Sequence, residues 1–320
     1  MSALLHLATF VLATHGGGGK GGGGEVVGGG KGVSSLLKDL GCGMANMAVP
    51  YFLTVPGYGV GRVMVDIGLH EGKETIAAVK VGFRVFAFEP LPAHVKMVVE
   101  GLEIAGLDYQ HAKLDDAGKL IEPLREPKAG QGIAYIFTAG AGRAHQVRSF
   151  TVDGPGSSFV DGFFAANRTS GKMAPAAEVL SIRIVPVADY VDTDVHYFKA
   201  DVQGFEMDVL MGALPLFSRR HVRLVTVELF SQGLRGAGSS PAQLLELLTE
   251  RLGLFCFSSM GDTNRPYHLP AGHPESGSGL LRMIRDSENR FERRAERPGG
   301  HRDRWGFFDD LTCVNPMMKR

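Results

Sequence analysis

The chain has 320 residues, 44% of them hydrophobic and 21% charged, which is typical of a globular protein with enough apolar material for a core. Its 34 basic and 34 acidic residues cancel, so no overall charge favours a nucleic acid or an anionic membrane as partner. The three cysteines, Cys42, Cys256 and Cys313, are widely spaced and form no C-x-x-C pair, which argues against a structural zinc or a disulfide framework and predicts buried free thiols.

The N-terminal region, residues 1–32, differs in composition from the rest. "ALLHLATFVLA" has the length of a signal peptide, but no basic residue precedes it and no clean cleavage site follows. Three interpretations stay open: a removed targeting segment, an N-terminal helix and a wrongly assigned chain start. The compartment is therefore unknown. We expect the cytoplasm unless residues 1–15 act as a signal segment. Residues 16–32 are dominated by glycine, which predicts a disordered tether. No other stretch is a candidate membrane span.

From residue 33 onward the sequence predicts one domain, with its core at 60–260, in which apolar strands alternate with helices. Helical patterns cover 71–82, 90–106, 205–217 and 240–253, the last with Ser240 as N-cap and Pro241 at the first helical position. Strand patterns cover 62–67, 84–89, 132–140, 178–187, 195–202, 222–230 and 253–259. This alternation favours a parallel α/β sheet, in which ligands bind beyond the carboxyl ends of the strands.

The first two strand ends carry a carboxylate each. In "DIGLHEG" Asp66 precedes Gly68 and Gly72, and the spacing fits neither G-x-G-x-x-G nor a phosphate-binding P-loop. In "FAFEP" Glu89 follows Asp66 by 23 residues, where a carboxylate is placed to accept hydrogen bonds from ribose hydroxyls. The pair predicts a nucleoside cofactor other than NAD, with an ordinary turn and a solvated glutamate as the alternative.

A third charged group lies around the end of the strand at 195–202 and the start of the next helix. "YFKADVQGFE" places Lys199, Asp201 and Glu206 around a turn at Gly204. An ion-paired strand edge is the alternative to a site, because an acidic residue also stabilises a helix N-terminus. His196, earlier in the same strand, is a further base candidate, but a surface position at the strand start is the preferred interpretation.

The ordered series "VDIGLHEGKET", "FAFEP", "GPGSSF", "VPVADYV", "FKADVQGFEMDVLMGA" and "VTVEL" resembles the FkbM family of S-adenosylmethionine-dependent methyltransferases. The resemblance covers roughly residues 60–230. It implies a Rossmann-like class I methyltransferase fold, with a mostly parallel seven-stranded sheet and a last antiparallel strand. The predicted strands at 253–259 and 310–315 are its last two, joined by an excursion over 261–305.

The resemblance also implies the roles of individual residues. S-adenosyl-L-methionine is the expected cofactor. Its methionine end would lie at the loop after the first strand, its ribose at the second strand end and its adenine near residues 138–139; these cofactor-binding candidates are Asp66, Gly68, His70, Gly72, Glu89, Thr138 and Ala139. The catalytic candidates are Asp201, Glu206 and Lys199, and the substrate-binding candidates are Ser157, Ser158 and Glu228. No metal ligand is assigned.

Two departures from the family pattern stand in the expected site. His70 occupies a position that is usually Asn, and Gln203 replaces a common Glu, which removes a carboxylate and argues against a metal. The resemblance implies O-methylation of a hydroxyl on a small-molecule, sugar or lipid-like acceptor, with no nucleic-acid partner and an unknown oligomeric state. A catalytically inactive binding or scaffold module of the same fold is the alternative. The turn after the first strand has no G-x-G-x-x-G, which disfavours an NAD-dependent oxidoreductase.

Overall fold

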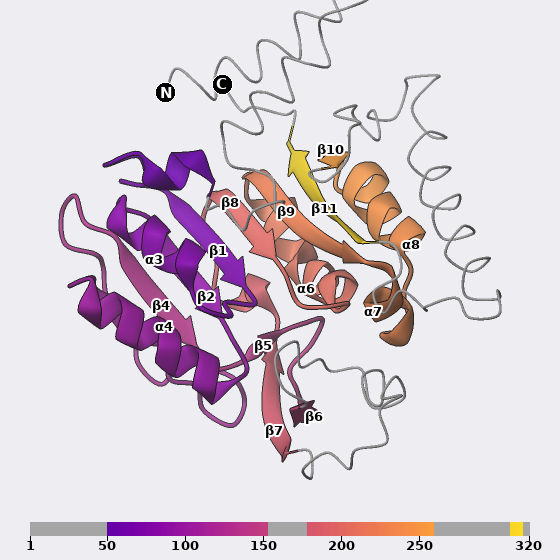
Figure 1. Cartoon of the computed structure of the whole chain (residues 1–320), viewed down its shortest axis with the longest axis horizontal. Coiled ribbons are helices and arrows are strands. Elements are labelled where there is room, and N and C mark those ends of the chain that lie inside the picture. The colour runs from indigo at the N-terminus through magenta and orange to yellow at the C-terminus, as the bar shows by residue number, and fades with distance from the viewer. Residues whose placement is uncertain (1–49, 153–177, 259–307, 316–320) are drawn as a thin grey trace, which may run out of the picture.

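The computed structural model describes residues 50–152, 178–258 and 308–315, and within these ranges strands and helices alternate (Figure 1). The helices and single turns are η2 (Tyr51–Thr54), α3 (Lys73–Lys80), α4 (Pro92–Ile104), η3 (Val187–Asp189), α6 (Glu206–Arg219), α7 (Ser231–Gly236), α8 (Pro241–Glu246) and η4 (Leu247–Arg251). The strands are β1 (Val63–Ile67), β2 (Arg84–Phe88), β3 (Tyr109–His111), β4 (Ile133–Phe137), β5 (Gly140–Ala141), β6 (Gln146–Val152), β7 (Glu178–Val185), β8 (Val195–Ala200), β9 (Val222–Phe230), β10 (Phe255–Ser258) and β11 (Phe308–Val314).

The main sheet has eight strands in the order β10-β11-β9-β8-β1-β2-β4-β3. β1 pairs in parallel with β2 and with β8, whereas β11 runs antiparallel to both β9 and β10. The mostly parallel sheet with a last antiparallel strand is therefore confirmed. The strand number differs from the expected seven, because β3 adds a short, partly exposed strand at the edge beside β4.

The central strands are buried on both faces, and alternate residues enter two separate cores. Val63, Val65 and Ile67 of β1 pack in a cluster with α6 and α8, and Met64 packs in the other cluster with α3 and α4. Such strands have no exposed polar face, which is why the sequence shows them as mostly apolar runs with a few polar residues such as Asp66 and Lys199. Helices thus cover both faces of the sheet (Figure 1).

A second sheet, in the order β5-β7-β6, hangs below the main sheet in the view of Figure 1. β6 and β7 are antiparallel, and Phe150 and Ile182 pack against Leu91, which follows β2. The guanidinium of Arg148 on β6 lies 5.5 Å from the ring centre of Phe205, just before α6. The small sheet therefore contacts the segments that follow both β2 and β8.

The helix predicted over 240–253 is found as α8 followed by the π-helical turn η4. The predicted N-cap is confirmed, because the Ser240 hydroxyl accepts a hydrogen bond from the Gln243 N–H at 3.3 Å, with Pro241 at the first helical position. The expected disordered region 1–32 and the excursion 261–305 lie outside the described residues, and the proposed domain limits stay a prediction.

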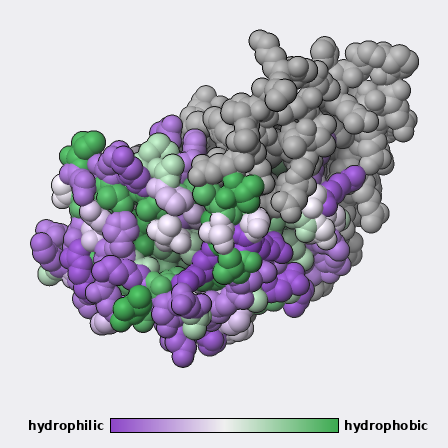
Figure 2. All heavy atoms as spheres, turned by 90° about the horizontal axis from the view of Figure 1, so that it is seen from below, coloured by the Kyte–Doolittle hydropathy of each residue, from purple (hydrophilic) through white to green (hydrophobic). Residues whose placement is uncertain are grey.

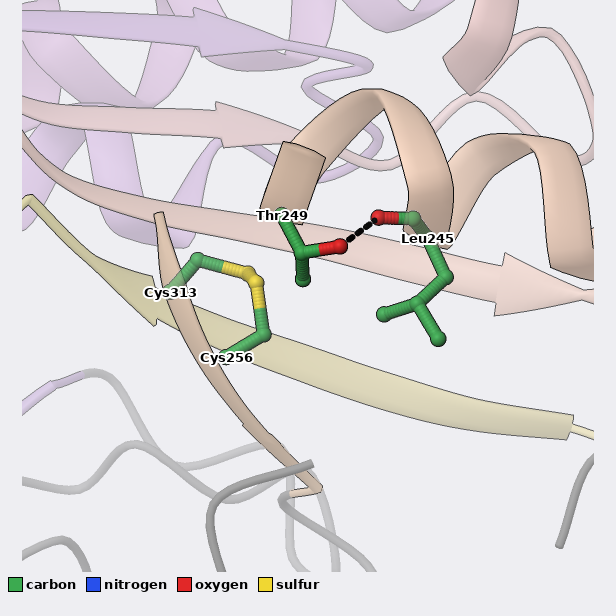
Figure 3. The surroundings of a disulfide bond; sticks show 4 residues. All are labelled: Leu245, Thr249, Cys256 and Cys313. Atoms are coloured by element: carbon green, nitrogen blue, oxygen red, sulfur yellow. Dashed lines mark hydrogen bonds between the residues drawn. A yellow bond between two sulfur atoms is a disulfide. The ribbon is translucent and has the colours of Figure 1, made fainter. Parts of the chain in front are cut away.

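The prediction of free thiols is wrong for two of the three cysteines. Cys256 on β10 and Cys313 on β11 form a fully buried disulfide (Figure 3). The register of the antiparallel pair places the two residues directly opposite each other. Their separation of 57 residues gives no sign of this pairing in the sequence. Cys42 lies outside the described residues.

Polar and apolar side chains are mixed on the face shown in Figure 2. Among the described residues, the large apolar side chains that are exposed are Val60, Met97, Ile104, Ile121, Val147 and Val179. Scattered apolar residues of this kind are normal on a protein surface. Within residues 50–152, 178–258 and 308–315, no helix combines the length and the apolar character that crossing a bilayer requires.

Candidate active site

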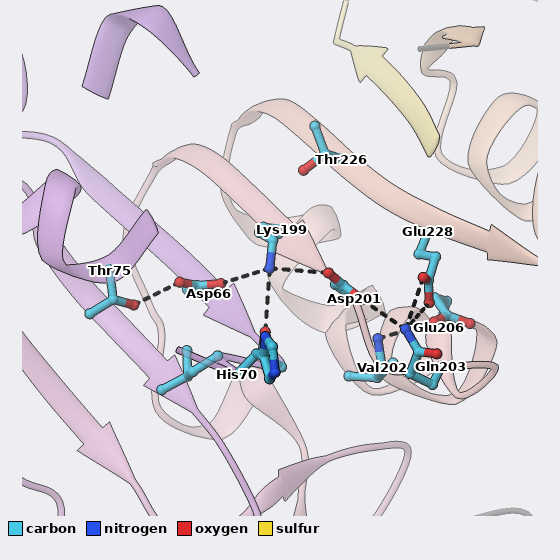
Figure 4. Close-up of polar contacts among 12 residues, drawn as sticks. Asp66, His70, Thr75, Lys199, Asp201, Val202, Gln203, Glu206, Thr226 and Glu228 are labelled. Carbon is cyan, nitrogen blue, oxygen red and sulfur yellow. Dashed lines mark hydrogen bonds and ion pairs between the residues drawn. The ribbon is translucent and has the colours of Figure 1, made fainter. Parts of the chain in front are cut away.

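The side chains predicted at the strand ends come together at one end of the main sheet, which we call the carboxyl edge (Figure 4). β2, β1, β8 and β9 are consecutive neighbours there and run parallel, so their last residues meet. The register pairs Asp66 directly with Lys199. Glu89 follows β2, and Glu228 lies near the end of β9.

The turn after β1 is in direct contact with the loop after β8. Gly68 has φ +82°, and a Cβ placed on it would lie 1.8 Å from the carbonyl oxygen of Asp201. No other residue fits this turn without moving the second loop. Gly72, also left-handed, precedes α3, where a Cβ would lie 2.6 Å from the side chain of Val98 on α4. Gly68 therefore joins two loops, and Gly72 permits close helix packing.

Glu89 lies against the backbone of the turn after β1. Its Oε2 accepts hydrogen bonds from the N–H groups of Leu69 at 3.1 Å and His70 at 3.4 Å, and its Oε1 accepts one from Leu91 at 3.0 Å. The side chain of His94, in the first turn of α4, forms an ion pair with Oε1 at 3.5 Å. The side chain of Glu89 is 5% exposed, so these contacts fix its position at the carboxyl edge.

Asp66 is completely enclosed. Its Oδ2 accepts a hydrogen bond from the Thr75 hydroxyl at 2.7 Å, and its Oδ1 lies 3.6 Å from Nζ of Lys199. Burial raises the pKa of Asp66 to about 6, although Lys199 opposes the increase. Asp66 has no exposed surface, so it cannot contact a ligand at the carboxyl edge directly. It acts there through its ion pair with Lys199.

Lys199 links the loops of β1 and β8. Its Nζ lies 3.6 Å from Asp66 and 3.5 Å from Asp201, and it donates to the carbonyl oxygen of Gly68 at 3.3 Å. Burial alone would lower the pKa of Lys199, but the two carboxylates outweigh burial and the pKa stays well above its ordinary value. The side chain of Asp201 is 26% exposed, so this carboxylate is open to a ligand.

Glu206, the first residue of α6, supports the loop before it. Its Oε1 accepts hydrogen bonds from the N–H groups of Val202 at 3.1 Å and Gly204 at 3.0 Å, and the residue is fully buried. Burial raises the pKa of Glu206 to about 8, against the effect of these backbone donors. Through these contacts Glu206 stabilises the conformation of the loop between β8 and α6.

Gln203 bridges two carboxylates (Figure 4). Its Nε2 donates to both oxygens of Glu228, at 2.9 and 3.0 Å, and lies 3.4 Å from Oδ1 of Asp201. Burial, followed by the charges of the neighbouring carboxylates, raises the pKa of Glu228 well above its ordinary value. An amide group therefore occupies the space between these acids.

His70 and Gln203 are the two non-glycine residues with positive φ in the described part of the chain, at +50° and +54°. Left-handed backbone at ordinary residues costs about 1–2 kcal/mol, and strained residues of this kind cluster at functional sites. His70 and Gln203 are also positions at which we expect the sequence to depart from the FkbM pattern. The strain therefore coincides with the site that the sequence predicts.

The sequence matches the model of the methyltransferase FkbM domain over residues 66–254, more than half of the chain. This chain belongs to the FkbM methyltransferase family. Among curated proteins, none matches the sequence. The matched region extends from Asp66 to the residue before β10, and so contains every strand end that forms the carboxyl edge.

The chain is similar to several solved structures. The methyltransferase FkbM of Methylobacillus flagellatus KT is 16% identical with a TM-score of 0.39; the match covers 79% of this chain but only 43% of that one. An O-methyltransferase from Bacillus cereus in complex with SAH is 9% identical (TM-score 0.36, 98% and 91% covered), and an rRNA methylase from Streptococcus thermophilus is 8% identical (0.36, 82% and 92%). At these TM-scores, below 0.5, the likenesses carry no functional argument.

The remaining predicted residues of the FkbM methyltransferase lie as follows. Thr138 and Ala139 come directly after β4, next to Glu89, whose N–H donates to the carbonyl of Phe137 at 3.1 Å; Thr138 is exposed and Ala139 buried. Ser157 and Ser158 fall outside the described residues. The assignment of Thr138 and Ala139 to adenine, and of Ser157 and Ser158 to the substrate, stays a prediction.

His196 is neither a surface residue nor part of the carboxyl edge. It lies at the start of β8, half-buried, with Nε2 3.0 Å from the hydroxyl of Tyr58. Burial lowers the pKa of His196 to about 3. It is therefore a neutral packing residue at the opposite end of the strand.

Sequence reasoning did not include Thr75 and His94. Each lies in a helix directly after a strand end and contacts the carboxylate of that strand, Asp66 or Glu89. The sequence pattern that could have indicated these two residues is a polar side chain in the first turn of the helix that follows each strand end. In the described ranges, no group of three or more His, Cys, Asp or Glu side chains has the arrangement of a metal site.

A cavity of about 440 Å³ lies at the other end of the sheet, where β2, β3 and β4 begin. Its lining includes Lys80, Gly82, Lys128 and Gly132. None of the carboxylates described above reaches it, so the cavity and the converging charges are separate features.

Proposed function

We propose that this FkbM methyltransferase uses S-adenosyl-L-methionine to methylate a hydroxyl group on a small-molecule, sugar or lipid-like acceptor. The observation that carries the proposal is the position of Glu89. Its carboxylate ends the second strand of the parallel sheet and adjoins the glycine turn after the first, where such a residue accepts ribose hydroxyls. The turn after the first strand lacks the G-x-G-x-x-G pattern, which speaks against a dinucleotide.

The residues around Glu89 fit an adenosyl cofactor. The backbone of Gly68 and His70 would face its methionine end, and Thr138, exposed beside Glu89, would lie at its adenine. Because Asp66 is enclosed, we assign it an indirect role, in which it holds Lys199 and through it the Gly68 turn. The cofactor supplies a methyl group that its sulfonium already activates.

On the acceptor side, Asp201 would accept the proton of the hydroxyl as its oxygen becomes methylated. Asp201 is partly exposed and ion-paired with Lys199, whereas Glu206 is buried under its own loop. Positioning of the acceptor and removal of its proton are the tasks left to the protein in this chemistry. Glu228, with Ser157 and Ser158, would bind the acceptor.

Calorimetry with S-adenosylhomocysteine and with NAD tests the cofactor assignment. We expect the nucleoside, but not NAD, to bind the wild type, and Glu89→Ala and Glu89→Gln to weaken this binding by more than tenfold. Glu103→Ala, an exposed glutamate on α4, serves as the control, and circular dichroism confirms that each variant is folded. Binding of NAD alone would overturn the proposal.

A second experiment distinguishes an enzyme from a binding module of the same fold. The binding module is favoured by Gln203, which stands where the family commonly has a glutamate. With labelled methyl donor and a panel of sugars, phenols and hydroxylated lipids, Asp201→Asn should lower kcat by roughly 10²–10⁴-fold while nucleoside affinity stays within about threefold. Nucleoside binding with no turnover of any acceptor would favour the module.

A further inference from the structure

Protein groups already occupy the hydrogen-bond-accepting positions of the Glu89 carboxylate. A carboxylate has about four positions at which it accepts hydrogen bonds. Leu69 and His70 occupy two at Oε2, and Leu91 and His94 occupy two at Oε1. Two adjacent ribose hydroxyls therefore need positions that protein donors now hold.

The four donors are not equally tight. The N–H groups of Leu69 and Leu91 lie at 3.1 and 3.0 Å and belong to buried backbone. The N–H of His70 lies at 3.4 Å and the ring of His94 at 3.5 Å, beyond the ordinary range of a strong hydrogen bond. Of these two, only His94 is a side chain, 26% exposed, that can rotate into water.

The surroundings of His94 make its proton depend on Glu89. Glu89 faces the ring from the end of β2, and the ring of His70, from the loop after β1, lies 5.4 Å away. The hydrogen bond to Glu89 raises the pKa of His94 above its ordinary value, although partial burial opposes the increase. Of the other charged groups on the adjoining turns, Lys73 pairs with Glu71 and Lys96 with Glu100, whereas Glu74 in the first turn of α3 acts on Asp66 and Lys199.

We propose that His94 and the ribose of the cofactor compete for Oε1 of Glu89, so that cofactor binding displaces His94 and releases its proton to solvent. The inference rests on the proposed function, since it needs a ribose at Glu89. It adds His94 to the cofactor site as a residue that controls affinity. No covalent bond changes in this step.

The direction of the effect follows from linkage. In the free protein the Glu89 contact favours protonated His94, and after displacement that contact is lost. The bound form therefore holds fewer protons, and the affinity rises with pH across the range in which His94 titrates in the free protein. Below that range, protonated His94 competes most strongly.

The test is calorimetry of S-adenosylhomocysteine binding from about pH 5.5 to about pH 8.5, in buffers of different ionisation enthalpy. For the wild type we expect release of a fraction of a proton per site and an affinity roughly threefold to tenfold weaker at the acidic end. His94→Gln, which keeps a donor but cannot titrate, should bind without this proton release and with little pH dependence. His145→Gln, which alters a histidine whose ion-pair partner is Asp189 and not Glu89, should behave as the wild type.

Three outcomes are distinguishable. Proton release that disappears in His94→Gln and persists in His145→Gln supports the inference. Binding without proton release in the wild type, or release that persists in His94→Gln, overturns it and leaves the proposed function intact. Failure of every folded variant to bind the nucleoside at any pH contradicts the proposed function itself, and the inference with it.

Discussion

Replacement of Glu206 by glutamine should stabilise the protein at alkaline pH. Glu206 is fully buried, and its pKa rises from 4.5 to about 8 because burial penalises its charged form. At about 1.4 kcal/mol per pH unit, the carboxylate lowers stability by about 5 kcal/mol once the pH exceeds 8. The folded state holds the proton more tightly than the unfolded chain, so this loss is absent below pH 4.5 and grows between these two values.

Glutamine keeps one oxygen to accept the two backbone hydrogen bonds that Oε1 accepts now. Its amide nitrogen would replace Oε2, which has no hydrogen-bond partner among the described residues, at a cost of about 1–3 kcal/mol. Glu206→Gln should therefore be roughly 2–4 kcal/mol more stable than wild type at about pH 9, and equal or less stable at about pH 5.

Urea unfolding followed by circular dichroism at about pH 5, 7 and 9 measures this difference. Glu126→Gln, at a glutamate that is 82% exposed, is the control and should show no such trend. A difference between wild type and Glu206→Gln that does not change with pH would refute the reasoning. Methyl transfer should survive in Glu206→Gln, and its loss by more than about a hundredfold in a folded variant would make Glu206 catalytic.

Three further substitutions test other parts of the structure. Gly68→Ala should lower the free energy of unfolding in urea by several kcal/mol, because the added Cβ would meet the carbonyl oxygen of Asp201. Gly57→Ala, at a left-handed glycine in open space, should lower it by only about 1–2 kcal/mol. Equal losses in the two variants would contradict the close approach at Gly68. Cys256→Ser should lose about 4 kcal/mol, as chain entropy predicts for a 57-residue separation, and a reducing agent should then have no further effect on its stability. Gln203→Glu adds a carboxylate where an amide now separates two others, so its Tm should rise with Ca²⁺ while that of Gln203→Met does not.

The fold was predictable because its central strands are buried on both faces. β1, β4 and β8 are mostly apolar runs between helical patterns, and this arrangement favours a parallel sheet. β3 was not predictable, since three partly exposed residues carry no periodicity. The disulfide depends on which residues of β10 and β11 stand opposite each other, and the sequence does not show this register.

The location of the candidate site was predictable in the same way, because polar residues after parallel strands meet at one edge. The contacts of each side chain were not. Asp201 and Glu206 look alike in the sequence, yet the turn between them leaves one partly exposed and closes the other under two backbone N–H groups. His94 needed the distance between a helix and a strand end, which spacing along the chain does not give.

The acids of the carboxyl edge differ in burial, and this difference suits the cationic methyl donor that we propose. Burial raises the pKa of Asp66 to about 6, of Glu206 to about 8 and of Glu228 well above its ordinary value. Of the acids at this edge, Asp201 alone has a substantially exposed side chain; Asp66, Glu89, Glu206 and Glu228 are buried. Several exposed carboxylates would stabilise the sulfonium before reaction as well as during it, and such uniform stabilisation does not raise kcat. The neutral amide of Gln203 supports this arrangement, because it contacts two of the acids without adding a charge.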